Sequence, residues 1–153
     1  MAECGVFTDW EVAEAQRDAI VAALPATFRT PIQIRKYIQG MSGKRLGEGV
    51  RAGIWLKPLG SESGTTFNAV QDVRHSTLLV MVQPSSTGDS SGAPRYDTYR
   101  QLIRGAFQNR RSTGLLCELF SQVDEADYEI DERLQRKMDV NLMVITTTIR
   151  EAR

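Results

Sequence analysis

The sequence predicts a single α+β domain in which a mainly antiparallel sheet is flanked by helices. With 153 residues the chain is long enough to bury one core and too short for two full domains and a linker. Two segments repeat apolar residues at helical spacing, whereas several others alternate apolar and polar residues or are rich in β-branched side chains. This mixture is typical of a sheet with helices packed on it, so we treat residues 1–153 as one domain.

The first helix is predicted to begin at Thr8 and to end near Pro25. Thr8 and Glu11 have the spacing of a capping box, which satisfies free backbone N–H groups at a helix start. The helical face behind them becomes apolar toward its end and consists of Ala13, Gln16, Arg17, Ile20, Val21 and Leu24.

A first pair of strands is predicted to follow this helix. Apolar and polar residues alternate from Ile32 to Ile38, which is the period of a half-buried strand. Residues 51–59 offer a second extended segment, and we expect the two to pair as a hairpin. The segment 40–49 between them contains four glycines and several charges, so we expect it to be a flexible tip.

The centre of the sheet is predicted at residues 70–83, where β-branched and apolar residues form a nearly continuous run. The polar segment 60–68 before it is expected to be a connection. The segment 84–94 after it, rich in Ser, Gly and Pro, is expected to be a flexible loop because it cannot bury apolar surface. We expect both flexible segments, 40–49 and 84–94, to become ordered when they dock on a partner.

The remaining elements are a second helix and two further strands. Apolar residues recur at helical spacing from Tyr96 to Phe107, and arginines gather toward the end of that segment, where they favour the helix dipole. Residues 115–123 suit a strand or one to two helical turns, and we favour a strand. Residues 138–149 alternate and then become β-branched, which predicts a closing strand.

Charge is balanced in total but separated along the chain. The 19 basic and 19 acidic residues cancel, which gives no support for bulk attraction to nucleic acid or membranes. Seven basic residues and one acid lie between Pro25 and Gly60, whereas residues 124–132 carry six acids and no base. Such blocks favour contacts between copies of the chain, although two solvated surfaces would look the same. The residues expected at this interface are Arg35, Lys36, Lys44, Arg45, Glu129, Asp131 and Glu132.

Enzymatic chemistry is not predicted, and no catalytic, cofactor-binding or metal-ligating residue is assigned. His75 is the only histidine, and its place in a strand favours a structural or surface imidazole. Gly43 and Lys44 resemble the end of a phosphate-binding loop, but Ile38 and Arg45 occupy the positions that need glycine and a hydroxyl residue. The acidic run lacks the glycine and the spacing of a calcium loop, and the serines of segment 84–94 lack an orienting base.

The cysteines and the first residues indicate in which cellular compartment the protein is made. Cys4 lies in a terminal arm and Cys117 in an apolar stretch, so we expect no disulfide. No run approaches the roughly 20 apolar residues of a membrane helix, and the first residues lack the order of a secretory signal. We therefore expect a soluble protein with no membrane partner that is made in the cytoplasm.

The order of these segments resembles the tail-terminator and head-to-tail joining proteins of tailed bacteriophages. The resemblance covers an N-terminal helix with QRDAIVAAL, the basic paired strands, DVRHSTLLVMVQ, a Ser/Gly loop, the helix YDTYRQLIRGAFQNRR and the closing strand VNLMVITTTIREAR. It implies a structural, non-enzymatic subunit of a hexameric ring in the neck of the virion, without a cofactor. Its implied partners are further copies of the chain, the tail tube protein, the head connector and DNA that passes through the opening without sequence recognition.

Other functions stay open. Another neck or baseplate component, or a non-viral ring protein, would have the same general properties. Tyr37 and Trp55 lie within the basic block, and aromatic and basic residues together are typical of nucleic-acid binding. The alternative from a different functional class is therefore a monomeric domain that binds nucleic acid or a small ligand. A hydrolase is the least favoured alternative.

Overall fold

The computed structural model describes residues 4–28, 30–67, 70–84, 96–108 and 111–152. The segment 85–94, predicted as a flexible loop, lies outside the described residues. The elements, in chain order, are α1 (Asp9–Ala23), β1 (Ile32–Ile34), β2 (Met41–Ser42), β3 (Arg45–Leu46), β4 (Gly53–Phe67), β5 (Val70–Pro84), α2 (Tyr96–Phe107), β6 (Glu118–Glu125), β7 (Glu129–Ile130), α3 (Glu132–Lys137) and β8 (Met138–Ala152).

The main sheet has five strands in the order β1-β4-β5-β8-β6. Strands β4, β5, β8 and β6 pair with their neighbours in antiparallel fashion, and β1 joins β4 in parallel. A second, smaller sheet has the order β2-β3-β7. The prediction of an α+β fold with a mainly antiparallel sheet is therefore confirmed.

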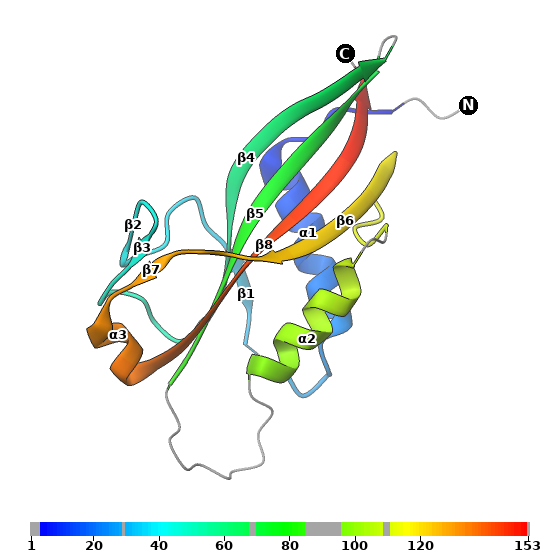
Figure 1. Ribbon diagram of the computed structural model, residues 1–153. Helices are drawn as coiled ribbons and strands as arrows, with labels where there is room; N and C mark the ends of the chain where they lie inside the picture. Colours follow the sequence, from blue (N-terminus) through cyan, green and yellow to red (C-terminus); the bar gives the residue numbers. More distant parts are fainter. Residues whose placement is uncertain (1–3, 29, 68–69, 85–95, 109–110, 153) are drawn as a thin grey trace.

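The two faces of the main sheet are covered differently (Figure 1). Helices α1 and α2 pack on one face, where Leu79 and Met143 from the central strands meet Ile20 and Ile103 from the helices in one apolar cluster. The small sheet and α3 pack on part of the other face, around Leu46, Leu78, Val80, Leu134 and Leu142. The central strands therefore bury side chains on both sides, as the continuous apolar run predicted.

The long segments with clear periodicity form the predicted elements. Helix α1 begins at the predicted N-cap Thr8, whose hydroxyl accepts from the Glu11 amide while the Glu11 carboxylate accepts from the Thr8 amide. These hydrogen bonds lower the pKa of Glu11, and the bond from the Thr8 backbone amide has the largest effect. Helix α2 and strands β5 and β8 follow the predicted segments, and residues 118–125 form strand β6.

The predicted hairpin between residues 32–38 and 51–59 is wrong. Strand β1 ends at Ile34 and pairs with β4 in parallel, with Ile32 opposite Ile54 and Ile34 opposite Leu56. Parallel pairing requires the chain to return to the same end of the sheet, and residues 35–52 make that crossover. Strand β4 forms its hairpin with β5 instead.

The predicted connection at residues 60–68 is also wrong, because β4 continues to Phe67. Ser61, Glu62 and Ser63 are exposed and pair with β5, so no apolar alternation marks them. Register shifts between Pro58 and Gly60 and between Ser63 and Thr66 fall in the part of β4 beyond Leu56, where β1 no longer pairs with it.

The segment 40–49 is folded rather than an open tip. It contains the β2-β3 hairpin, in which Met41 lies opposite Leu46, and both side chains are buried. Gly40 has φ +85°, and a Cβ there would lie 2.5 Å from the amide nitrogen of Val50. At least this glycine therefore serves a close backbone approach that no other residue permits.

Leu79→Asp is expected to abolish folding. Leu79 is completely buried at the centre of the sheet, so the substitution places an unpaired carboxylate in the core at a cost of about 4 kcal/mol or more. Circular dichroism with thermal melting measures the effect. Leu59→Asp, at a β4 position that is 43% exposed, is the matched control and should change stability by about 0.5 kcal/mol or less. Equal melting temperatures for the two variants would contradict the assignment of Leu79 to the core.

Gly40→Ala and Gly105→Ala are expected to have opposite effects. At Gly40 the positive φ and the contact with Val50 should cost about 1–3 kcal/mol. At Gly105, inside α2 with no atom within 4 Å of the added Cβ, alanine should stabilise by about 0.5–1 kcal/mol. Chemical denaturation of both variants measures the difference, and a neutral Gly40→Ala would show that segment 40–49 is loosely held.

Candidate functional site

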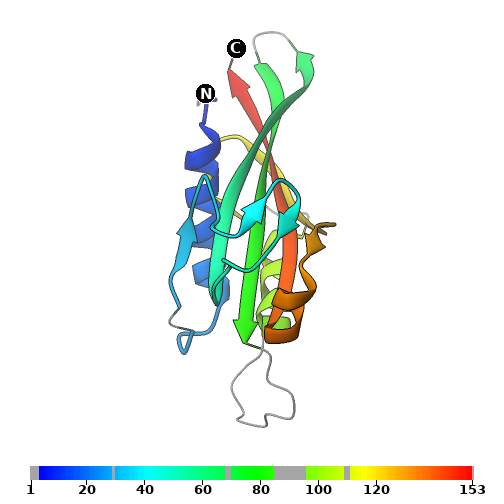
Figure 2. The ribbon, with the colours of Figure 1, turned by 90° about the vertical axis from the view of Figure 1, so that its left-hand side faces the viewer.

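A hollow of about 540 Å³ lies where the chain leaves β1 and where it returns toward β4. The amide of Arg35 donates to the Leu56 carbonyl at 2.8 Å, which fixes the start of this turn against β4. The hollow is lined by Gln33, Arg35, Tyr37, Ile38, Gln39, Gly49, Arg51, Ala52 and Trp55. In Figure 2, β1 runs along one side of the molecule.

The hollow is basic and partly aromatic, and none of the described residues that line it carries a carboxylate. Arg35 donates from Nε and Nη2 to the Gln33 side-chain oxygen, at 3.2 and 2.9 Å, rather than to an acid. Within the described residues, Arg35, Lys36 and Arg51 form no ion pair. Tyr37 is 69% exposed beside them. This surface therefore presents uncompensated positive charge next to an aromatic ring.

The other two basic residues expected at the interface, Lys44 and Arg45, lie elsewhere. They belong to the β2-β3 hairpin, which is next to β7 in the small sheet. The Lys44 carbonyl accepts from the Glu129 amide at 3.0 Å, and Arg45 Nη2 lies 3.4 Å from Asp131 Oδ2. The side chains of Arg45 and Asp131 therefore meet within one chain, whereas Lys44 contributes its backbone carbonyl and has an exposed side chain.

The predicted acidic residues divide in a similar way. Asp131 is the N-cap of α3, where its carboxylate accepts from the Arg133 amide at 2.8 Å, so its role within the chain is structural. Glu129 and Glu132 are exposed and form no ion pair among the described residues. They line a groove of about 700 Å³ together with Arg45, Ile130, Asp131, Arg133 and Arg136, so its charge is mixed.

The hollow and this groove lie on either side of the β2-β3 hairpin, toward opposite edges of the main sheet. Strand β1 is at one edge of the main sheet, and β6, which leads into β7 and α3, is at the other. Figure 2 shows β1 and α3 at the two sides of the view, with the β2-β3 hairpin between them.

A buried polar cluster is the feature that sequence reasoning missed. His75 is 2% exposed, and its Nδ1 lies 2.7 Å from the Asp9 carboxylate and its Nε2 3.4 Å from that of Glu151. Nearby, the Gln16 side chain donates to Thr147, whose hydroxyl also contacts that of Ser121. The polar residues Thr147 and Glu151 lie on the helix-facing side of β8 within an otherwise apolar pattern, which is the signal that could have revealed the cluster.

This cluster joins α1 to the sheet. Asp9 is in the first turn of α1, Gln16 is on its buried face, and their partners lie on β5 and β8. Every contact given above for His75 is with a carboxylate, so its geometry fits a structural imidazole, one of the two alternatives given by the sequence.

Among the residues that the structure describes, no group of three or more His, Cys, Asp or Glu side chains is placed to hold a metal ion. No helix in the described ranges is long and apolar enough to cross a membrane. Comparison with protein-family models and with curated proteins finds no match to this chain.

Proposed function

We propose that the chain is a structural subunit that assembles head to tail into a closed ring, of the tail-terminator or neck type. The observation that carries the proposal is the uncompensated positive charge of Arg35 and Arg51, which line the hollow, with the exposed Lys36 next to Arg35 in the chain. Glu129 and Glu132, exposed acids that form no ion pair among the described residues, lie on the other side of the β2-β3 hairpin.

A heterologous contact requires two different, complementary surfaces at separate places on one subunit. Such a contact repeats from copy to copy and closes into a ring when the rotation between neighbours allows it. In this arrangement the hollow of one subunit receives Glu129 and Glu132 of the next. Arg45 and Asp131 contact each other within one chain, so we leave them out of the proposed contact, whereas the exposed side chain of Lys44 stays a candidate for it.

The role of the ring comes from the resemblance. Proteins of the tail-terminator and joining type end the tail tube, dock it to the head connector and let DNA pass through a central opening. For this chain we propose the same position in the virion, a hexamer as the oligomeric state, and no enzymatic activity. Contacts with the tube and the connector then use the two ends of the ring, because its sides are occupied by neighbouring subunits.

A second candidate function is a monomeric domain that binds nucleic acid or another anionic ligand. The hollow itself favours it, because Arg35 and Arg51 can neutralise phosphates while Tyr37 and Trp55 offer stacking surfaces. The two candidate functions differ in the number of chains that associate. A binding domain stays monomeric at high protein concentration and takes up a fluorescent single-stranded oligonucleotide, whereas a ring subunit assembles without one.

Native mass spectrometry of the purified chain is expected to show a closed oligomer, with a hexamer as the main species at high protein concentration. Because the proposed contact joins exposed charges, raising the salt from about 0.05 M to 1 M should shift the equilibrium toward monomer as the Debye length falls to about 3 Å. Adding purified tail tube protein serves as the second condition. A chain that stays monomeric in both conditions contradicts the ring, and a salt-insensitive ring contradicts the charge contact alone.

A further inference from the structure

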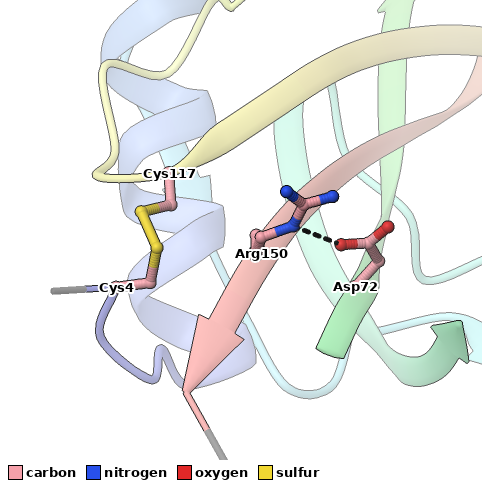
Figure 3. Close-up of a disulfide and its surroundings, with 4 residues drawn as sticks. All are labelled: Cys4, Asp72, Cys117 and Arg150. Carbon is pink, nitrogen blue, oxygen red and sulfur yellow. Dashed lines mark hydrogen bonds and ion pairs between the residues drawn. A yellow bond between two sulfur atoms is a disulfide. The ribbon is translucent and has the colours of Figure 1, made fainter. Parts of the chain in front are cut away.

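Cys4 and Cys117 form a disulfide, so the expectation that these cysteines stay apart is wrong. They are 113 residues apart in sequence, but the fold brings the arm before α1 beside the start of β6 (Figure 3). Helix α1 runs along the sheet from the end at which β8 finishes, and this places the N-terminal arm next to the last residues of β8. No local pattern in the sequence marks that proximity.

The disulfide joins two segments that share one edge of β8. Pairing between β6 and β8 reaches Glu118 opposite Ile149. Beyond it, the Arg150 amide donates to the Cys117 carbonyl at 3.0 Å. Two residues later the Ala152 amide donates to the Gly5 carbonyl at 3.3 Å, which is the spacing of donors on one side of a strand. The arm therefore lies along the same edge of β8 as β6, beyond the point at which the β6 pairing ends.

The arm is held at few points besides the disulfide. Val6 is 69% exposed, and the Phe7 amide donates to the Glu151 carboxylate at 2.7 Å. From Thr8 onward the chain has its own anchors, because the capping box fixes the start of α1 and Asp9 contacts His75. Residues 4–6 thus depend on the disulfide and on the bond from Ala152, whereas Phe7 and α1 do not.

Two properties of the cysteines suit reversible chemistry. Both side chains are half-buried rather than enclosed, so a small thiol can reach them. Cys117 also has φ +63°, a left-handed conformation that is costly for a residue with a Cβ. The disulfide and the bond from Arg150 are the contacts that hold it there, and opening the disulfide removes one of them.

We propose that Cys4 and Cys117 are a thiol-disulfide exchange site that fastens the N-terminal arm over the end of β8 when oxidised and frees it when reduced. The oxidant is a small-molecule disulfide of the glutathione class. One cysteine thiolate attacks it and expels a thiolate, and the second cysteine then attacks the mixed disulfide and expels another. One disulfide forms in the protein, one is consumed, and the two cysteine protons leave with the two small thiols. This proposal does not depend on ring formation.

The test compares backbone amide exchange by NMR in the oxidised and the reduced wild-type chain, in reduced and oxidised glutathione buffers of defined ratio. Reduction should accelerate exchange of the Ala152 amide by about tenfold or more, because local opening exposes it without global unfolding. The Phe7 amide and the β5 amides should stay protected. The double variant Cys4→Ser, Cys117→Ser should match the reduced wild type in both buffers.

Several outcomes overturn the proposal. Alkylation of both thiols in fully oxidising glutathione buffer would show that the disulfide does not form. Unchanged Ala152 exchange on reduction would show that the disulfide does not hold the arm. Loss of protection throughout the chain would show that the disulfide is needed for the whole fold rather than for the arm.

Discussion

The pairing of β5 with β8 is the constraint on which the rest of the molecule depends. The two strands are in register from Val70 opposite Ala152 to Pro84 opposite Met138, so each of the 15 residues of one has a partner on the other. Side chains of this pair contribute to both apolar clusters, with Leu79 and Met143 in one and Leu78 and Leu142 in the other. The helices and the small sheet are therefore attached to opposite faces of the same two strands.

This central pair also explains where polar groups are tolerated. Toward the end of β8 the core side chains give way to Thr147 and Glu151. Thr147 accepts a hydrogen bond from Gln16 of α1, and Glu151 accepts one from the Phe7 amide and lies 3.4 Å from His75 Nε2. Buried polar groups of this kind are costly unless they are paired, so they fix how α1 lies on the sheet. The N-terminal arm is held against the end of β8 by hydrogen bonds at Phe7 and Gly5 and by the disulfide.

The parts of the fold that local sequence could predict are those whose own residues determine them. Strands β5 and β8 and helix α2 carry clear periodicity, and α1 carries its own cap. The parallel partner of β1, the polar half of β4, the packed segment around Gly40 and the disulfide depend on contacts between distant segments. The charge contact between copies stays a prediction. Arg35, Lys36, Lys44, Glu129 and Glu132 are exposed and remain candidates for it, whereas Arg45 lies beside Asp131 within one chain.

Mixing two charge-reversed variants tests the head-to-tail contact most directly. Variant one carries Arg35→Glu and Lys36→Glu, and variant two carries Glu129→Lys and Glu132→Lys; all four positions are exposed, so folding should be preserved. Each variant alone brings like charges together at every contact and is expected to stay monomeric at low salt. An equal mixture should restore a ring in which the two variants alternate, visible by native mass spectrometry as an even-numbered oligomer with equal numbers of each. Assembly of either variant alone at the wild-type level, or a mixture that stays monomeric, would contradict the account.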